Sequence, residues 1–205
     1  MILSDACVAE GAAWLCQQEP RLAAVMDDLP ALPLRLKPDG FAALFSAIVS
    51  QQVSVASANA IWDRLQRADM ITPAAVARAS EEDLRGLGLS RQKVRYAHAL
   101  AAAEIDYDAL HDLPAAEVIK TLTSVTGIGT WTAEIYAMFS LGRADVFAPG
   151  DLALQEAAKL IFDLPARPSE RDLRVMAEAW SPWRSVAARI IWAYYAYDKQ
   201  REGVT

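Results

Sequence analysis

The sequence has 205 residues, of which 54% are hydrophobic, and its 20 basic and 26 acidic side chains give a formal net charge of -6. This length and composition allow one large domain or two small ones with a substantial core. The acidic balance argues against a protein that coats nucleic acid through bulk charge. Any contact with nucleic acid would be local, for example at helix N-termini, where backbone N–H groups bind phosphate.

The N-terminal segment places Asp5 and Glu10 where a secretory signal would carry basic residues, and no apolar run reaches membrane-spanning length. We therefore expect a soluble, cytoplasmic protein. Its two cysteines, Cys7 and Cys16, are too few for a disulfide framework, an all-cysteine zinc site or an iron–sulfur cluster. We expect both thiols to be reduced and buried.

Nearly every segment of the chain has helical periodicity. Apolar residues recur at helical spacing over residues 41–49 and again over 94–101. Ser80 and Ser169, each followed by acidic residues, are typical helix starts, and a proline precedes a helix predicted at about 115–124. Convincing alternating strands are absent, so we expect an all-α protein of roughly ten short helices.

Two segments are candidate boundaries between domains. One is the proline-rich connector at residues 27–39, and the other is the glycine-bounded segment 142–150. We therefore expect a central helical bundle at 34–144, and a second helical lobe that joins residues 1–33 to residues 145–205.

A first glycine break interrupts the helical pattern at Gly127-Ile128-Gly129, and Thr130 and Thr132 open the next helix. Glycine permits positive φ and close backbone approach, and the N–H groups of the first helical turn point outward. This pattern predicts a cradle for phosphate. The alternative, from these residues alone, is a plain helix–turn–helix connection whose glycines only end the first helix.

A second break, Pro149-Gly150, precedes Asp151 and a helix predicted at 152–162. An aspartate at this position is typical of an N-cap that accepts a backbone hydrogen bond. The N-terminus of a helix also favours negative charge, which suits a carboxylate that is needed as an anion. Both interpretations of Asp151 stay open on these residues.

Four segments in order along the chain resemble the helix-hairpin-helix (HhH-GPD) DNA glycosylase superfamily, and more narrowly the 3-methyladenine DNA glycosylase II family. They are FSAIVSQQVSVASANAIWDRL (45–65), GLGLSRQKVRYAHALA (86–101), the stretch 121–157 with both glycine breaks, and WSPWRSVAARIIWAYY (180–195). The resemblance implies two helical lobes with a DNA-binding cleft between them, and a helix-hairpin-helix motif at about 115–140.

The resemblance also implies the chemistry, since Asp151 matches the family's catalytic aspartate. A fixed carboxylate stabilises the positive charge that develops on the sugar as the C1′–N bond breaks, and aligns the attacking water. A base alkylated at a ring nitrogen already carries positive charge and leaves without a general acid. Trp131 stands where bifunctional relatives carry a Schiff-base lysine, so we expect a monofunctional hydrolase without lyase activity.

The base pocket implied by the resemblance includes Trp131 and Trp192, with Tyr136 and Tyr195 as weaker candidates and Glu134 as a second acid. A cationic base gains roughly 0.5–2 kcal/mol over a tryptophan face. On the residues alone, the aromatic side chains are core packing, and Glu134 is solvated or ion-paired. Other residues replace family aromatics at Ile135, Leu152 and Ala193, so we expect a less aromatic pocket, and both a lower activity and a shifted substrate preference stay open as its consequence.

Gln51 and Gln52 interrupt an apolar helix where the family places its DNA-probing loop. Gln52 is the candidate to fill the gap left by the flipped nucleotide, and Gln51 would support the turn or meet the opposite strand. A plain helix C-terminus is the alternative. The resemblance further implies a structural Na+ or K+ on the backbone carbonyls of Thr123, Val125 and Ile128, and no required cofactor.

The expected partner is double-stranded DNA containing alkylated bases, bound by a monomer that does not contact a membrane. Arg91, Lys93 and Arg95 are either a small phosphate-facing patch or surface charge. The alternatives to this function are a glycosylase for another damaged base, a non-catalytic helix-hairpin-helix DNA-binding module in which Asp151 only caps a helix, and a helical structural protein.

Overall fold

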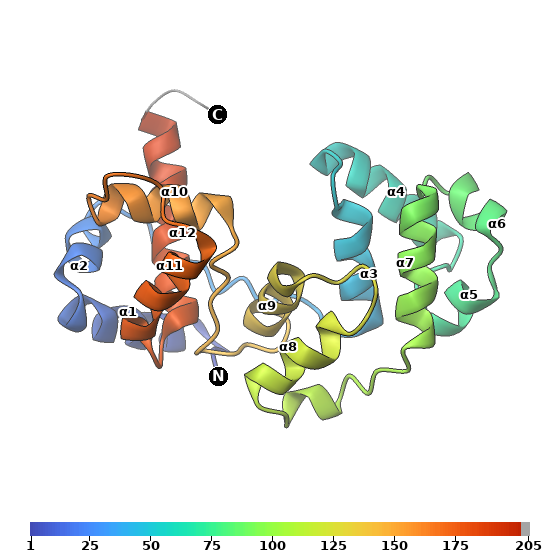
Figure 1. Ribbon diagram of the computed structural model, residues 1–205, viewed down its shortest axis with the longest axis horizontal. Helices are drawn as coiled ribbons and strands as arrows, with labels where there is room; N and C mark the ends of the chain where they lie inside the picture. Colours follow the sequence, from blue (N-terminus) through green and yellow to red (C-terminus); the bar gives the residue numbers. More distant parts are fainter. Residues whose placement is uncertain (202–205) are drawn as a thin grey trace. The chain divides into compact units, whose positions relative to one another are not determined.

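The computed structural model describes residues 1–201, which form twelve α-helices and two short 3₁₀ helices and contain no strand (Figure 1). The all-α prediction is therefore confirmed. Within the same residues, no helix is both long and apolar enough to cross a membrane. In chain order the helices are α1 (Asp5–Gln18), α2 (Pro20–Met26), α3 (Phe41–Ser50), α4 (Val55–Arg67), α5 (Pro73–Arg78), α6 (Glu81–Gly86), α7 (Arg91–Ala102), η1 (Ala109–His111), α8 (Ala115–Thr123), α9 (Thr130–Phe139), α10 (Leu152–Ile161), α11 (Glu170–Met176), η2 (Ala177–Trp180) and α12 (Arg184–Arg201).

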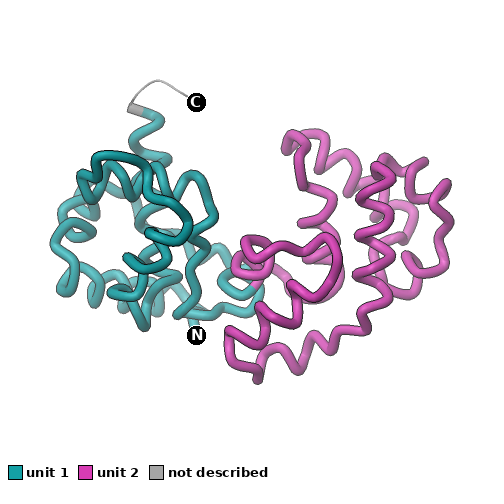
Figure 2. Tube along the Cα trace, viewed as in Figure 1, with its two compact units in different colours: residues 1–36, 137–205 teal, residues 37–136 magenta. Residues whose placement is uncertain are grey.

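The chain divides into two compact units (Figure 2). Unit 1 comprises Met1–Leu36 and Ala137–Thr205, and unit 2 comprises Lys37–Tyr136. The chain returns from unit 2 to unit 1 between Tyr136 and Ala137, within α9. The sequence analysis placed this boundary later, after residue 144. The reason is that residues following α9 hydrogen-bond to the start of α12, as in the bond from Ser185 N to Ala144 O at 2.9 Å.

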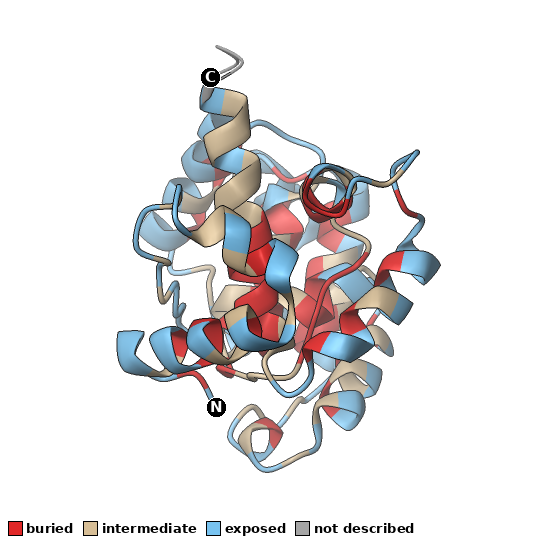
Figure 3. Cartoon of the chain, turned by 90° about the vertical axis from the view of Figure 1, so that its left-hand side faces the viewer, coloured by how far each residue is buried: buried red, intermediate tan, exposed pale blue. Residues whose placement is uncertain are grey.

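Unit 1 is organised around α12, which packs against α10, α1 and α2. Between Ser185 and Ile191 every residue of α12 is buried, and the helices of this unit carry buried residues on their inner faces (Figure 3). Gly11 of α1 permits the close approach of α12's N-terminal region, because a Cβ there would lie 2.7 Å from Trp183 Cε3. Hydrophobic burial along α12 therefore sets the position of any functional side chain that it carries.

Unit 2 is built on α3, whose apolar stripe from Phe41 to Val49 is buried against α4 and α7. The predicted helix starts are present: Ser80 and Asp83 form a capping box at α6, and Pro114 immediately precedes α8. These short helices owe their ends to local capping and their stability to the shared core.

The two cysteines differ from expectation. Cys7 and Cys16 are only half-buried, whereas the sequence analysis predicted that both are buried. They lie at the margins of the buried stripe of α1, which runs through Val8, Ala12 and Leu15. The sequence predicted helical structure here, but it did not show which face of α1 is turned to the core and therefore whether the cysteines are buried.

Candidate functional site

Asp151 is the N-cap of α10, and its carboxylate is held by three N–H donors. Oδ1 accepts hydrogen bonds from the backbone N–H groups of Ala153 at 3.0 Å and Leu154 at 3.1 Å. It also accepts a bond from Trp192 Nε1 on α12, again at 3.1 Å. Three donors converging on one oxygen fix the direction of the carboxylate while the side chain remains half-buried.

The turn before Asp151 is itself held in place. The Asp151 N–H donates to Ala148 O at 3.0 Å, and the buried side chain of Gln155 donates from Nε2 to Pro149 O at 2.8 Å. The proline and glycine allow a tight turn at a point where the helix must start afresh. The first turn of α10 thus binds both the carboxylate and the backbone that leads to it.

Trp192 combines a packing contact with its hydrogen bond. Its ring lies against Phe139, with centroids 5.7 Å apart and the planes tilted by 35°. The guanidinium of Arg189, one turn earlier on α12, lies 4.8 Å from the centroid of Phe139. Burial lowers the pKa of Arg189 to about 10, and its nitrogens donate to Ser185 O and Leu34 O at 2.9 and 2.8 Å. The ring contact with Phe139 and the hydrogen bond to Asp151 therefore hold the indole in one orientation.

The hairpin between α8 and α9 requires glycine at residue 127. Gly127 has φ +100, and a Cβ at this position would lie 2.4 Å from Tyr96 Cγ. Ile128 is buried, and its N–H donates to Val125 O at 3.0 Å, which closes the turn. The break in the helical pattern thus corresponds to a tight connection packed on the ring of Tyr96.

The first turn of α9 is partly open to solvent. Gly129 and Thr130 are exposed, with no atom within 4 Å of a Cβ built on Gly129. Trp131 is 45% exposed, whereas Thr132 is buried at 7%. Backbone N–H groups at an exposed helix start suit an anion. The side chain of Thr132 packs inward, so a contact made by this residue would use its main chain.

The probing-loop candidates lie against the hairpin within unit 2. Gln51 donates from Nε2 to Gly127 O at 3.0 Å, and Gln52 is exposed in the left-handed region at φ 57. A polar cavity of about 260 Å³ adjoins both glutamines and is also lined by Ser90 and Gln92. One amide hydrogen bond therefore connects the loop to the hairpin turn.

Lys93 is not a member of a surface patch. It is 9% exposed, and its Nζ donates to Val49 O at 2.6 Å at the end of α3. Burial lowers the pKa of Lys93 below its usual value. Arg91 and Arg95 are exposed, and Arg91 Nε lies 3.3 Å from Glu81 Oε1. Sequence reasoning missed Lys93 as an anchor because the bond spans two helices far apart in the chain.

The remaining pocket candidates have different environments. Tyr136 is 4% exposed and its hydroxyl accepts the Gly40 N–H at 2.8 Å, while burial raises the pKa of Tyr136 to about 12. Glu134 is 1% exposed, which contradicts the solvated alternative, while its roles as a second acid of the pocket or as an ion-paired residue stay predictions. Leu152, directly after Asp151, is 61% exposed. Three others, Ile135, Ala193 and Tyr195, are half-buried.

The predicted residues thus gather in two groups, each inside one unit. In unit 1, Asp151 and Trp192 are hydrogen-bonded to each other. In unit 2, Gln51 and Gly127 join the loop to the hairpin. The first group offers a fixed carboxylate beside an indole, and the second offers exposed backbone donors beside an exposed glutamine.

Comparison with known proteins places this arrangement in a family. Residues 45–185 match the HhH-GPD superfamily base excision DNA repair protein family. DNA-3-methyladenine glycosylase 2 of Escherichia coli is 31% identical over 177 residues, which are 80% of this chain and 60% of that protein. The chain spans 64% of the length of a Bacillus subtilis relative that is 27% identical.

Two solved structures have the same fold. The DNA-3-methyladenine glycosidase from Bacillus halodurans matches with a TM-score of 0.82 and 33% identity, covering 91% of this chain and 89% of that one. The 3-methyladenine DNA glycosylase Mag1 of Schizosaccharomyces pombe, in complex with abasic DNA, matches with a TM-score of 0.70 and 28% identity over 85% and 89% of the two chains. The chain belongs to the HhH-GPD superfamily of base excision DNA repair proteins.

Proposed function

We propose that this protein is a monofunctional DNA glycosylase that hydrolyses the N-glycosidic bond of alkylated purines, chiefly 3-methyladenine. The observation that carries the proposal is the Asp151 carboxylate, held by two backbone N–H groups and the indole N–H of Trp192. Relatives of similar length and fold are named 3-methyladenine glycosylases. A glycosylase needs this kind of fixed carboxylate beside the sugar.

Asp151 acts on the sugar as the bond to the base breaks. Positive charge develops at C1′, and a carboxylate in a fixed position stabilises it without reorganising during the reaction. The same carboxylate aligns the attacking water and accepts its proton. The alkylated purine leaves as a neutral base, because its ring already carries the positive charge, so the reaction needs no separate acid.

Trp131 limits the reaction to hydrolysis. Tryptophan offers no amine to form a Schiff base with the sugar, so the product is an abasic site in an unbroken strand. Trp131 is 45% exposed, and the proposed role of its ring is to stack on the flipped base. A cationic base gains roughly 0.5–2 kcal/mol over such a face, which neutral bases do not share.

The hairpin between α8 and α9 binds the DNA backbone, and the loop that carries Gln52 enters the duplex. Backbone N–H groups at Gly129 and Thr130 bind a phosphate, and Gln52 fills the gap left by the flipped nucleotide. The chain acts as a monomer on double-stranded DNA, in the cytoplasm where that DNA lies. The exposure of Gln52, Gly129 and Thr130 supports these assignments.

The hairpin turn also suits a monovalent cation, Na+ or K+, on the carbonyls of Thr123, Val125 and Ile128. Val125 O accepts one N–H bond, from Ile128, and a carbonyl oxygen has a second lone pair for a cation. A bound cation would supply positive charge for a DNA phosphate. The carboxylate chemistry at Asp151 does not depend on it.

The test compares wild type with Asp151→Asn for release of free 3-methyladenine from methylated duplex DNA, and for binding to an abasic-site analogue. Asparagine is as good an N-cap as aspartate, so we expect folding stability to change by less than about 0.5 kcal/mol. We expect excision to fall at least about 100-fold and binding to persist. Asp163→Asn is the matched control, because Asp163 is exposed just after the C-terminus of α10.

Two outcomes would contradict the proposal. Full activity in Asp151→Asn would show that another group carries the chemistry. A wild-type protein that binds DNA but releases no methylated base would indicate a binding module or another substrate, to be sought among deaminated and oxidised bases.

A further inference from the structure

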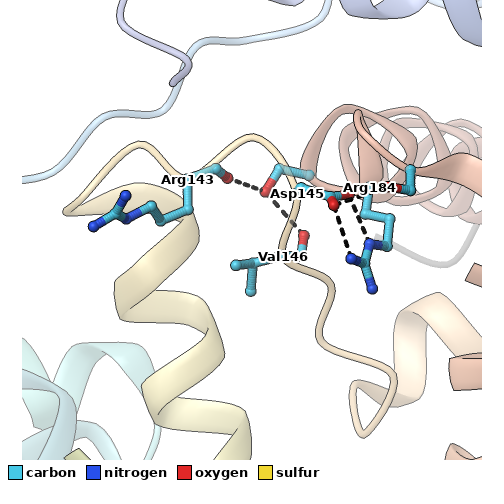
Figure 4. Close-up of polar contacts among 6 residues, drawn as sticks. Arg143, Asp145, Val146 and Arg184 are labelled. Atoms are coloured by element: carbon cyan, nitrogen blue, oxygen red, sulfur yellow. Dashed lines mark hydrogen bonds and ion pairs between the residues drawn. The ribbon is translucent and has the colours of Figure 1, made fainter. Parts of the chain in front are cut away.

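The loop from Ser140 to Asp151 is fastened to the first turn of α12. Figure 4 shows the guanidinium of Arg184 facing the carboxylate of Asp145. Arg184 Nε donates to Asp145 Oδ1 at 2.7 Å and its second nitrogen donates to Oδ2 at 2.8 Å, while the Ser181 hydroxyl adds a bond to Oδ2 at 2.9 Å. The carboxylate is thus held by a fork and a third donor, which fixes its direction as well as its distance.

Ser185, the next residue of α12, holds the backbone on both sides of Asp145. Its N–H donates to Ala144 O at 2.9 Å. Its hydroxyl lies 2.5 Å from Arg143 O and 2.9 Å from Val146 O. Ser185 is fully buried, so these contacts exclude water. Every residue from 143 to 146 is therefore bonded to Arg184 or Ser185.

The segment between this attachment and Asp151 is packed against unit 1. Phe147 meets Trp180 edge-on at 5.3 Å, and Ala148 is fully buried. Ala148 O in turn accepts the N–H of Asp151 at 3.0 Å. Little freedom remains in these residues, so a shift at Asp145 is passed along the backbone to the catalytic carboxylate.

The same helix holds both ends of this path. Arg184 and Ser185 lie in the first turn of α12, and Trp192, which bonds to Asp151, lies further along it. We infer that the Arg184–Asp145 pair and Ser185 are positioning residues that set the loop so that Asp151 meets the indole N–H of Trp192. The inference rests on the proposed function, because it assigns these residues a part in placing the carboxylate for base excision.

The pair is better suited to placing the loop than to stabilising the fold. About a third of each side chain is exposed, 33% for Arg184 and 37% for Asp145, and such ion pairs contribute little to stability. The guanidinium also holds the pKa of the Asp145 carboxyl below its usual range, so the fork persists through neutral and mildly acidic pH. A misplacement of about 1 Å at a reacting group can cost about 100-fold in rate.

The experiment compares Arg184→Lys and Asp145→Asn with wild type. Lysine keeps the charge and loses the fork, and asparagine keeps the shape and loses the charge. The matched control is Glu156→Gln, which breaks the similarly exposed Arg167–Glu156 pair of unit 1, 2.9 Å long. Single-turnover release of 3-methyladenine, affinity for abasic-site DNA and the thermal midpoint are measured for each.

We expect single-turnover release to fall by about 10- to 100-fold in both variants, with affinity for abasic DNA within about twofold of wild type. The control should match wild type in both. The second measurement is the indole ¹H–¹⁵N resonance of Trp192, assigned by its loss in Trp192→Phe. It should shift in both variants and stay in place in the control.

Unchanged release in both variants overturns the inference, as does slower release with an unmoved Trp192 resonance. Wild type without excision would refute the proposed function separately, because the Trp192 resonance still reports whether Arg184 and Asp145 position the loop. A resonance that shifts under those conditions supports the positioning role alone.

Discussion

Replacing Trp192 by phenylalanine removes one of three donors from Asp151 and keeps an aromatic ring against Phe139. A hydrogen bond to a charged group contributes about 1.5–3 kcal/mol. If that bond orients the carboxylate in the transition state, its loss slows base release by about 10- to 150-fold. The effect stays below complete loss because the N–H groups of Ala153 and Leu154 still hold Oδ1 at 3.0 and 3.1 Å.

The assay is single-turnover release of 3-methyladenine with enzyme in excess, which separates chemistry from product release. A double-mutant cycle with Asp151→Asn distinguishes the two roles that an indole can have here. If Trp192 acts by orienting Asp151, its replacement has little further effect once the carboxylate is gone. A loss that persists undiminished in the Asp151→Asn background would refute the orienting role and assign Trp192 to stacking on the base. A wild-type rate in the single variant would refute both.

Three further predictions concern unit 2. Gly127→Ala places a methyl at φ +100, 2.4 Å from Tyr96 Cγ, so we expect destabilisation of about 1–3 kcal/mol by denaturant unfolding, against little change in Gly129→Ala. A Gly127→Ala protein as stable as wild type would contradict this packing. Burial raises the pKa of Tyr136 to about 12 from an unfolded value near 10, so the unfolded state loses its proton first and stability falls as pH rises through 10 to 12. Wild type should lose about 1.4 kcal/mol by pH 11 that Tyr136→Phe does not, and parallel stability curves for the two proteins would refute the sign. Arg91→Ala should reduce the salt slope of DNA binding by about one unit if Arg91 contacts phosphate, and leave it unchanged if its partner is only Glu81.

The sequence predicted what depends on near neighbours. The helix start at Ser80, the N-cap at Asp151 and the glycine turn before α9 each follow from residues within a few positions of one another. Asp151 could also be proposed as the catalytic carboxylate, because the family resemblance implies that role. Helix caps and turns can thus be predicted from the sequence without knowledge of the tertiary structure.

The contacts that orient the site span longer distances. The bond between Trp192 and Asp151 joins residues 41 apart, and that between Gln51 and Gly127 joins residues 76 apart. Helical periodicity reports which face of one helix is apolar, and it carries no information on which helix lies opposite. The donor role of Trp192 therefore had to come from the structure.

The burial of charged side chains was also difficult to predict. Lys93 was predicted in a phosphate-facing patch or among surface charges, and Glu134 as a second acid of the pocket or as a solvated or ion-paired residue. Both are buried in unit 2, at 9% and 1% exposure. For Lys93 the partner is a backbone carbonyl at a helix end, Val49 O. Every residue has such a carbonyl, so the sequence does not show which one a buried lysine contacts.

Asp151 both caps α10 and carries the proposed chemistry, and this double role has a consequence for how a loss of repair would be detected. Because asparagine caps a helix as well as aspartate does, a substitution to asparagine would leave a folded protein at normal abundance in the cell. Under the proposed function, that protein would bind alkylated DNA without releasing the base. If Asp151 carries the chemistry, measurements of protein level would therefore not reveal the loss of repair, and only an assay of base release would.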